Sequence, residues 1–152
     1  MRDRRFVAVH RGGLLELEAH RLLAGWAAEC AGHLLRGLPF AMEDGRLVDA
    51  IEVGRAWARG EVRTVAAMKA AVACHAVARE VVDGAAVVAA RAVGHAVATA
   101  HMADHCLGVV LYGRKAIELS GGVFEMERAW QVAQLPELVR ELVVSALEGR
   151  GW

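Results

Sequence analysis

The stretch AAVVAARAVGHAVATAHMADHCLGVVLYGRKAIEL, residues 85–119, decides the fold of this chain. It is rich in alanine and valine and contains no proline, and we expect it to favour helix throughout. Roughly 35 residues at 1.5 Å per residue would make a rod about 52 Å long. A compact domain formed by the whole chain of 152 residues is only about 38 Å across. We therefore expect a break or a sharp bend between Gly94 and Asp104.

Helical periodicity on both sides of this stretch predicts an all-α protein. We expect one compact domain over residues 1–152, with about six or seven helices packed as an irregular bundle. Glycine, proline and Asp-Gly pairs mark the ends of the elements. Residues 1–13 have no helical period and form an irregular arm, in which FVAV could be a lone short strand. The other expected helices are Leu15–Arg36, Arg46–Gly60, Glu61–Val82, Val123–Gln134 and Pro136–Gly151.

The composition limits the class of protein. Hydrophobic residues make up 56% of the chain and aromatic residues only 5%, so the core must be built from small side chains. Eighteen basic and eighteen acidic residues leave no net charge, which argues against a nucleic-acid-binding or membrane-surface protein. Cys30, Cys74 and Cys106 are widely spaced and indicate free thiols. The charged opening residues are unlike a signal peptide, so we expect a cytoplasmic protein.

The segment AHMADH contains a candidate metal site. His101 and His105 are four residues apart, so on one helix they would share a face and could ligate one ion. Asp104 would lie at the margin of that face, and a third ligand would come from His75 or His95. Histidines that cap a helix break are the favoured interpretation. Binding of zinc or another divalent metal, with or without enzymatic activity, is the alternative.

No catalytic constellation in the sequence is complete. Cys74 and His75 are neighbours, and on a helix they would point about 100° apart rather than toward each other. The run from Gly108 to Gly113 resembles a phosphate-binding loop, but Arg114 follows the second glycine where a lysine is needed. The lysine comes one position later, and Ala116 stands after it in place of the hydroxyl. We therefore expect a protein that is not an enzyme and needs no cofactor.

A basic ridge is the candidate partner-binding surface. Arg55, Arg59 and Arg63 follow one another at a spacing of four residues, and Trp57 lies among them. Such a ridge is usually solvated surface, and contact with an acidic partner is the alternative. Trp57 is interpreted in the same way: core packing is typical of a helical tryptophan, and a partner-binding hot spot is the second interpretation.

Several segments in order along the chain resemble a family of small, all-helical bacterial immunity proteins associated with polymorphic toxins. The resemblance runs from Arg2 to about Leu142 and so covers nearly the whole chain. The positions that carry it include His20, Arg21, Trp26, Trp57, His95, His101, His105, Gly108, Trp130 and Pro136. The segments are RDRRFVAVHRGGLL, EAHRLLAGWAAECAGHLL, GRAWARGEV, AVGHAVATAHMADHCLGVVLYGRKAIEL and MERAWQVAQLPELVREL.

The resemblance implies a protein that neutralises a toxin used in competition between bacteria by binding it directly. The implied partner is a cognate protein toxin, and no catalytic residues are implied. Immunity proteins against basic nucleases are often acidic, whereas this chain is neutral, so the class of toxin stays open. The helices rich in alanine and valine also leave a homo-oligomer as an alternative assembly.

Overall fold

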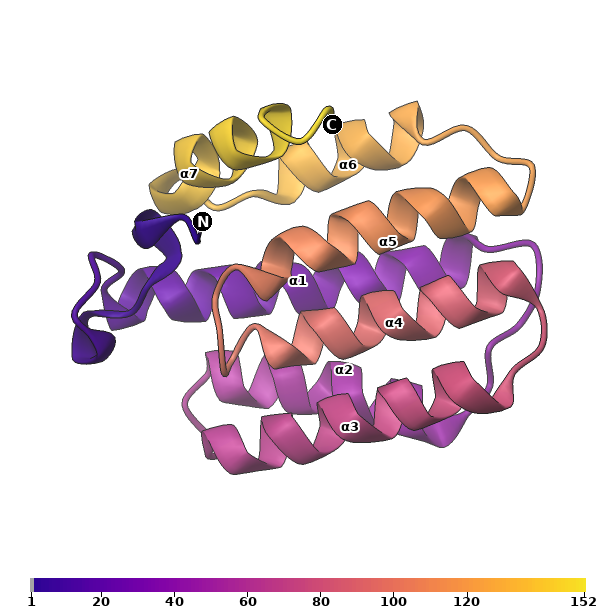
Figure 1. The fold of residues 1–152 in the computed structure, drawn as a ribbon, viewed down its shortest axis with the longest axis horizontal. Helices are drawn as coiled ribbons and strands as arrows, with labels where there is room; N and C mark the ends of the chain where they lie inside the picture. The colour runs from indigo at the N-terminus through magenta and orange to yellow at the C-terminus, as the bar shows by residue number, and fades with distance from the viewer. Residues whose placement is uncertain (1) are drawn as a thin grey trace.

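The computed structural model describes residues 2–152, which fold into seven α-helices after two short 3₁₀ turns (Figure 1). The all-α prediction is confirmed: residues 2–152 include no β-strand, only an isolated parallel bridge between Ala8 and Leu15. The elements are η1 (Arg4–Phe6), η2 (Val9–Arg11), α1 (Leu17–Gly37), α2 (Gly45–Ala58), α3 (Thr64–Glu80), α4 (Gly84–Ala98), α5 (His105–Leu119), α6 (Glu125–Gln134) and α7 (Glu137–Glu148).

The helices form two layers and a cap. In Figure 1, α3, α4 and α5 make the front layer, α1 and α2 lie behind it, and α6 and α7 run along the top. Helix α1 is central, because it packs against α2, α4, α5, α6 and α7. The buried side chains of these helices form one continuous core. One outer side of α1 therefore remains open between α2 and the α6–α7 pair.

The long apolar stretch is broken as its length requires. Helix α4 ends at Ala98 and α5 begins at His105, so the break lies within the predicted interval. The two helices then run back along each other and pack together closely. Thr99, which is fully buried, stands at the turn, and its hydroxyl donates to the carbonyl of His95 at 3.1 Å.

Small residues bring the helices of the front layer together. A Cβ atom at Gly94 would lie 3.0 Å from Cε1 of His75 on α3. A Cβ atom at Gly108 would lie 2.5 Å from Nδ1 of His95 on α4. Both distances are shorter than ordinary packing allows, so the two glycines set how closely α3, α4 and α5 approach. The core of small side chains expected from the composition depends on this close approach.

Two local expectations are wrong. The FVAV segment is not a strand: Phe6 ends η1, Val9 begins η2, and Ala8 between them makes only the isolated bridge to Leu15. It is nevertheless anchored, since Phe6 is buried. The third helix begins at Thr64 rather than at Glu61, because Arg63 is extended and Glu61 binds the side chain of Arg59. The expected glycine stop is confirmed, because Gly60 adopts φ +77° just after α2.

Candidate functional site

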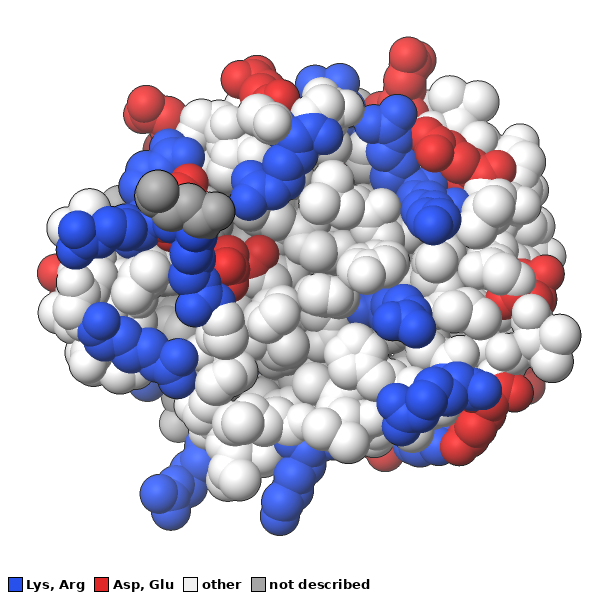
Figure 2. Space-filling model, viewed as in Figure 1, with Lys and Arg blue, Asp and Glu red and all other residues white. Residues whose placement is uncertain are grey.

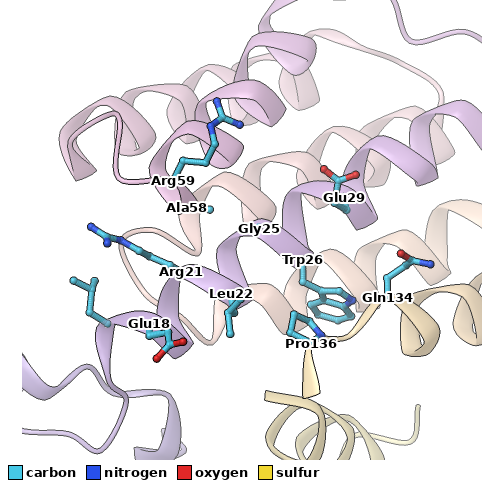
Figure 3. A pocket seen from close by; sticks show the side chains of 11 residues that line it. Glu18, Arg21, Leu22, Gly25, Trp26, Glu29, Ala58, Arg59, Gln134 and Pro136 are labelled. Atoms are coloured by element: carbon cyan, nitrogen blue, oxygen red, sulfur yellow. The ribbon is translucent and has the colours of Figure 1, made fainter. Parts of the chain in front are cut away.

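An open groove with a volume of about 720 Å³ follows the uncovered side of α1 (Figure 3). Helix α1 forms its floor, the end of α2 forms one wall and the α6–α7 junction forms the other. We call it the α1 groove. Its surface is mainly apolar, with charged side chains along the rim. The lining residues are Leu17, Glu18, Arg21, Leu22, Gly25, Trp26, Glu29, Ala58, Arg59, Gln134 and Pro136.

The sequence of α1 explains why the groove is present. Gly25 has no side chain, and a Cβ atom there would touch Cβ of Ala58 at 3.5 Å, so the floor stays low beside α2. Leu17 leaves 53% of its surface exposed at one end of the groove. Trp26 is 3% exposed, and its Nε1 donates to the backbone carbonyl of Gln131 at 2.9 Å. That bond fixes α6 against α1 and holds the second wall in place.

The charges on the rim are balanced, and half of them are bound within the protein. Arg55 donates from Nε to Oε1 of Glu29 at 2.7 Å. Arg59 donates from Nε to Oε1 of Glu61 at 2.9 Å, which raises the pKa of its guanidinium above the ordinary value. By contrast, no ion pair or side-chain hydrogen bond joins Glu18 or Arg21 to another residue of 2–152. These two side chains are therefore free to meet a partner.

A second hollow of about 550 Å³ continues along α1 and α2 beyond the Arg55–Glu29 pair. Its apolar surface includes Val48, Met42 and Leu35, and its lining also contains the acids Glu43 and Asp49. Val48 is 57% exposed. The apolar surface along α1 is thus longer than the α1 groove alone.

The predicted basic ridge is mostly engaged within the chain. Arg55 and Arg59 bind Glu29, Glu52 and Glu61, although Arg59 also lines the α1 groove. Arg63 is exposed and precedes α3. The partner-binding role of these arginines stays a prediction.

Trp57 occupies the core rather than the surface. Only 8% of it is exposed, and its Nε1 donates to the hydroxyl of Thr64 at 3.1 Å. The ring of His20 packs against it, with the ring centroids 4.8 Å apart. This burial favours the core interpretation of Trp57.

Three of the predicted metal residues come together across α3, α4 and α5. Nδ1 of His95 lies 3.0 Å from Nδ1 of His105, so one of these nitrogens donates a hydrogen bond to the other. The His75 and His95 rings meet edge to face with centroids 6.0 Å apart. The ring of Tyr112 stacks on the ring of His95, with the ring centroids 5.0 Å apart. The bend therefore brings His95 to His105, as the metal hypothesis required.

The other two predicted ligands are placed elsewhere. His101 lies in the turn before α5 and lines a small space beneath the N-terminal arm, together with Arg2 and Phe6. Asp104 accepts two hydrogen bonds from Arg2, at 3.0 and 3.2 Å. Within residues 2–152, no group of three or more His, Cys, Asp or Glu side chains is arranged to hold a metal ion. The geometry gives the metal alternative no support.

His20, rather than a histidine of AHMADH, binds the backbone carbonyl at the helix break. It is 4% exposed, and its Nε2–H donates to the carbonyl of Thr99 at 2.6 Å. Burial lowers the pKa of His20, so the neutral ring is favoured. The capping role expected for a histidine is therefore present at a residue that the spacing argument did not single out.

The histidine cluster predicts acid sensitivity. Burial, together with the charges of His105, His75 and Arg91, lowers the pKa of His95 to about 4, against the opposite effect of Asp104. An unfolded histidine has a pKa of about 6.5, so below that pH the unfolded chain binds more protons than the folded one. Stability should therefore fall as the pH drops from about 6.5 to 4, by at most about 1.4 kcal/mol per unit for one group.

Urea unfolding of the unchanged chain and of a His95→Gln variant at several pH values measures this slope. We expect the variant to lose stability less steeply over the same range. Equal slopes would show that His95 does not carry the effect.

Sequence reasoning missed the α1 groove because three separate parts of the chain build it. Leu22 and Gly25 fall within the wide apolar face expected for the first helix, and nothing in that face indicates which part stays uncovered. The available signal was Pro136, since it fixes a sharp junction between the last two helices. Arg21, Trp26 and Pro136, which carry the family resemblance, all line the groove.

A comparison with protein families identifies the family of this chain. Residues 13–138 match the family described as "Imm-5 like putative immunity protein". The chain belongs to this family. The match spans α1 to α6 and the start of α7, and therefore includes every residue that lines the α1 groove. No curated protein and no solved structure matches the chain.

Membership of the Imm-5 like family implies a toxin as partner. Among the helices described over residues 2–152, none is both long and apolar enough to cross a membrane. The three cysteines are buried free thiols, and burial raises the pKa of Cys74 to about 12. Burial thus disfavours the thiolate, which is the reactive form of a cysteine side chain.

Proposed function

We propose that this chain is a non-catalytic immunity protein of the cytoplasm that neutralises a cognate bacterial toxin by direct contact. The α1 groove would receive an apolar part of the toxin. The observation that carries the proposal is this open, mainly apolar groove in a member of the Imm-5 like family.

The groove has the layout of a protein-binding surface. Protein interfaces combine a buried apolar centre with a polar rim, and a few anchoring side chains in pockets supply most of the binding energy. Leu17 and Leu22 would surround such an anchor, and Trp26 and Pro136 hold a wall that is already formed. Arg21 lies at the rim and points outward, free to bind a partner (Figure 3).

The balanced charge of the α1 groove limits the kind of toxin surface that we expect it to bind. The groove carries two acids, Glu18 and Glu29, and two arginines, Arg21 and Arg59. Such a surface suits a toxin region that is apolar and weakly charged. A strongly basic nuclease surface would instead require an acidic partner.

A single substitution at the groove tests the proposal. Leu17→Asp puts a charge where the toxin's apolar group would be buried, and we expect at least about 30-fold weaker binding, equivalent to about 2 kcal/mol. Leu17 is the first residue of α1, where an acid suits the helix dipole, so the fold should be retained. Calorimetric titration with a toxin domain that the unchanged chain binds measures the change.

Val82→Asp is the matched control, because Val82 is 97% exposed and lies in the loop between α3 and α4, away from the groove. It should bind the toxin as the unchanged chain does. Equal affinity of the Leu17→Asp and Val82→Asp variants would remove the groove from the interface.

A further inference from the structure

Carboxylates are confined to the ends of the three helices in the front layer. Residues 64–119 contain only four acids, and none lies in the middle of a helix. Each is already bound: Glu80 by Arg46, Asp104 by Arg2 and Glu118 by Arg114, whereas Asp83 caps α4. In Figure 2 the middle of this face is mostly white with blue side chains, and most red side chains lie toward its edges. The centre of the layer therefore has no carboxylate.

Four cations of the same layer have no such partner: Lys69, Arg79, Arg91 and Lys115. The first two come from α3, Arg91 from α4 and Lys115 from α5, and all four are exposed. None of them forms an ion pair with another residue of 2–152. Arg79 and Arg91 both lower the pKa of His75, so their positive charges lie near that ring. The layer therefore carries an unbalanced positive charge although the whole chain is neutral.

Apolar side chains accompany these cations. On α3, Met68 is 43% exposed and Val72 is 66% exposed, and the spacing from Val72 to His75 puts them on one side of the helix. Tyr112 on α5 is half-buried and covers the ring of His95. We call this surface, with Arg79, Arg91 and Lys115, the α3–α5 face.

We propose that the α3–α5 face is a second docking surface, which binds the carboxylate-bearing and partly apolar surface of another protein. Charge complementarity carries the assignment, because unpaired cations around an apolar centre attract carboxylates and disfavour cations. The face shares no residue with the α1 groove. The proposal therefore goes beyond toxin binding at the groove and does not depend on it.

Other occupants match the face less well. A two-fold pair of copies would bring Arg91 of one chain toward the same cations of the other, which is repulsive. Nucleic acid requires a dense basic patch that neutralises many phosphates, whereas the cations of the α3–α5 face are few and are accompanied by exposed Met68 and Val72. An acidic protein surface fits both the charges and the aliphatic side chains.

Titration with a defined probe tests the proposal. The probe is a synthetic amphipathic helical peptide with glutamates at i, i+4 and i+7 beside leucines, added to the ¹⁵N-labelled chain and followed by NMR. We expect shifts of the backbone signals of Val72, Arg91 and Tyr112. The Arg79→Glu/Arg91→Glu double variant should bind the peptide at least about tenfold more weakly.

Arg11→Glu is the charge-matched control, since Arg11 is exposed, forms no ion pair within residues 2–152 and lies in the η2 turn, outside α3, α4 and α5. It should bind the peptide as the unchanged chain does. A peptide with glutamine in place of glutamate and a short DNA duplex complete the comparison. The proposal is overturned if the acidic peptide does not bind, if the glutamine peptide binds equally, if DNA binds in preference, or if the double reversal changes nothing.

Discussion

Gly108→Ala is expected to lower the free energy of unfolding by about 2 kcal/mol. The added Cβ would lie 2.5 Å from Nδ1, 2.6 Å from Cγ and 3.1 Å from Cβ of His95. These atoms include the base of the ring side chain, so a rotation of the ring alone cannot clear the space. Either α4 and α5 move apart or His95 loses its hydrogen bond to His105. Urea unfolding of the two chains measures the difference.

Gly84→Ala is the control for this result. Gly84 is the first residue of α4, and a Cβ there meets nothing within 4 Å. Alanine should be neutral or slightly stabilising at that position, since it lowers the entropy of the unfolded chain. If Gly108→Ala were as stable as Gly84→Ala, the close approach of α4 and α5 would not be a constraint on the fold.

His20→Ala should lower the free energy of unfolding by about 3 kcal/mol. His20 is 4% exposed and donates to the carbonyl of Thr99 at 2.6 Å, so its removal leaves a buried carbonyl without this donor. It also leaves a cavity beside Trp57, against which the ring packs. Thermal unfolding and urea unfolding should both show this loss in the free energy of unfolding.

The matched change is His10→Ala, because His10 is exposed in the η2 turn. We expect it to alter stability by less than about 0.5 kcal/mol. A loss at His20 no larger than the loss at His10 would mean that the turn between α4 and α5 is held by other contacts.

The sequence predicted the helices well because their ends are marked by local chemistry. Asp44 and Asp83 accept hydrogen bonds from backbone N–H groups at the starts of α2 and α4. Gly60 supplies the left-handed stop after α2. The bend followed from length alone, because no rod of that size fits a compact domain.

The histidine pattern was harder to interpret, because the prediction of a shared face assumed that His101 and His105 lie on one helix. The spacing of His101 and His105 has ligand geometry only on one continuous helix, and the bend falls between them. His101 then turns toward the N-terminal arm, whereas His105 meets His95. Contacts between residues distant in sequence decide both outcomes, and a spacing argument has no access to them.

Which charged side chains stay unpaired on the surface also depends on contacts between residues that are distant in sequence. Arg55 and Arg59 were expected to form a free basic ridge, but acids from α1, from α2 itself and from the following loop bind them. Arg91 and its neighbours on the front layer, by contrast, form no ion pair within residues 2–152. Helical periodicity predicts that a side chain is exposed but not which charge lies opposite it in the folded chain.

Growth of cells that produce candidate toxin domains encoded near the gene tests the central claim most directly. The unchanged chain and Val82→Asp should restore growth, whereas Leu17→Asp should fail although it accumulates as folded protein to the same level. Failure of the unchanged chain to protect would contradict the immunity function. Full protection by Leu17→Asp would contradict the assignment of toxin binding to the α1 groove.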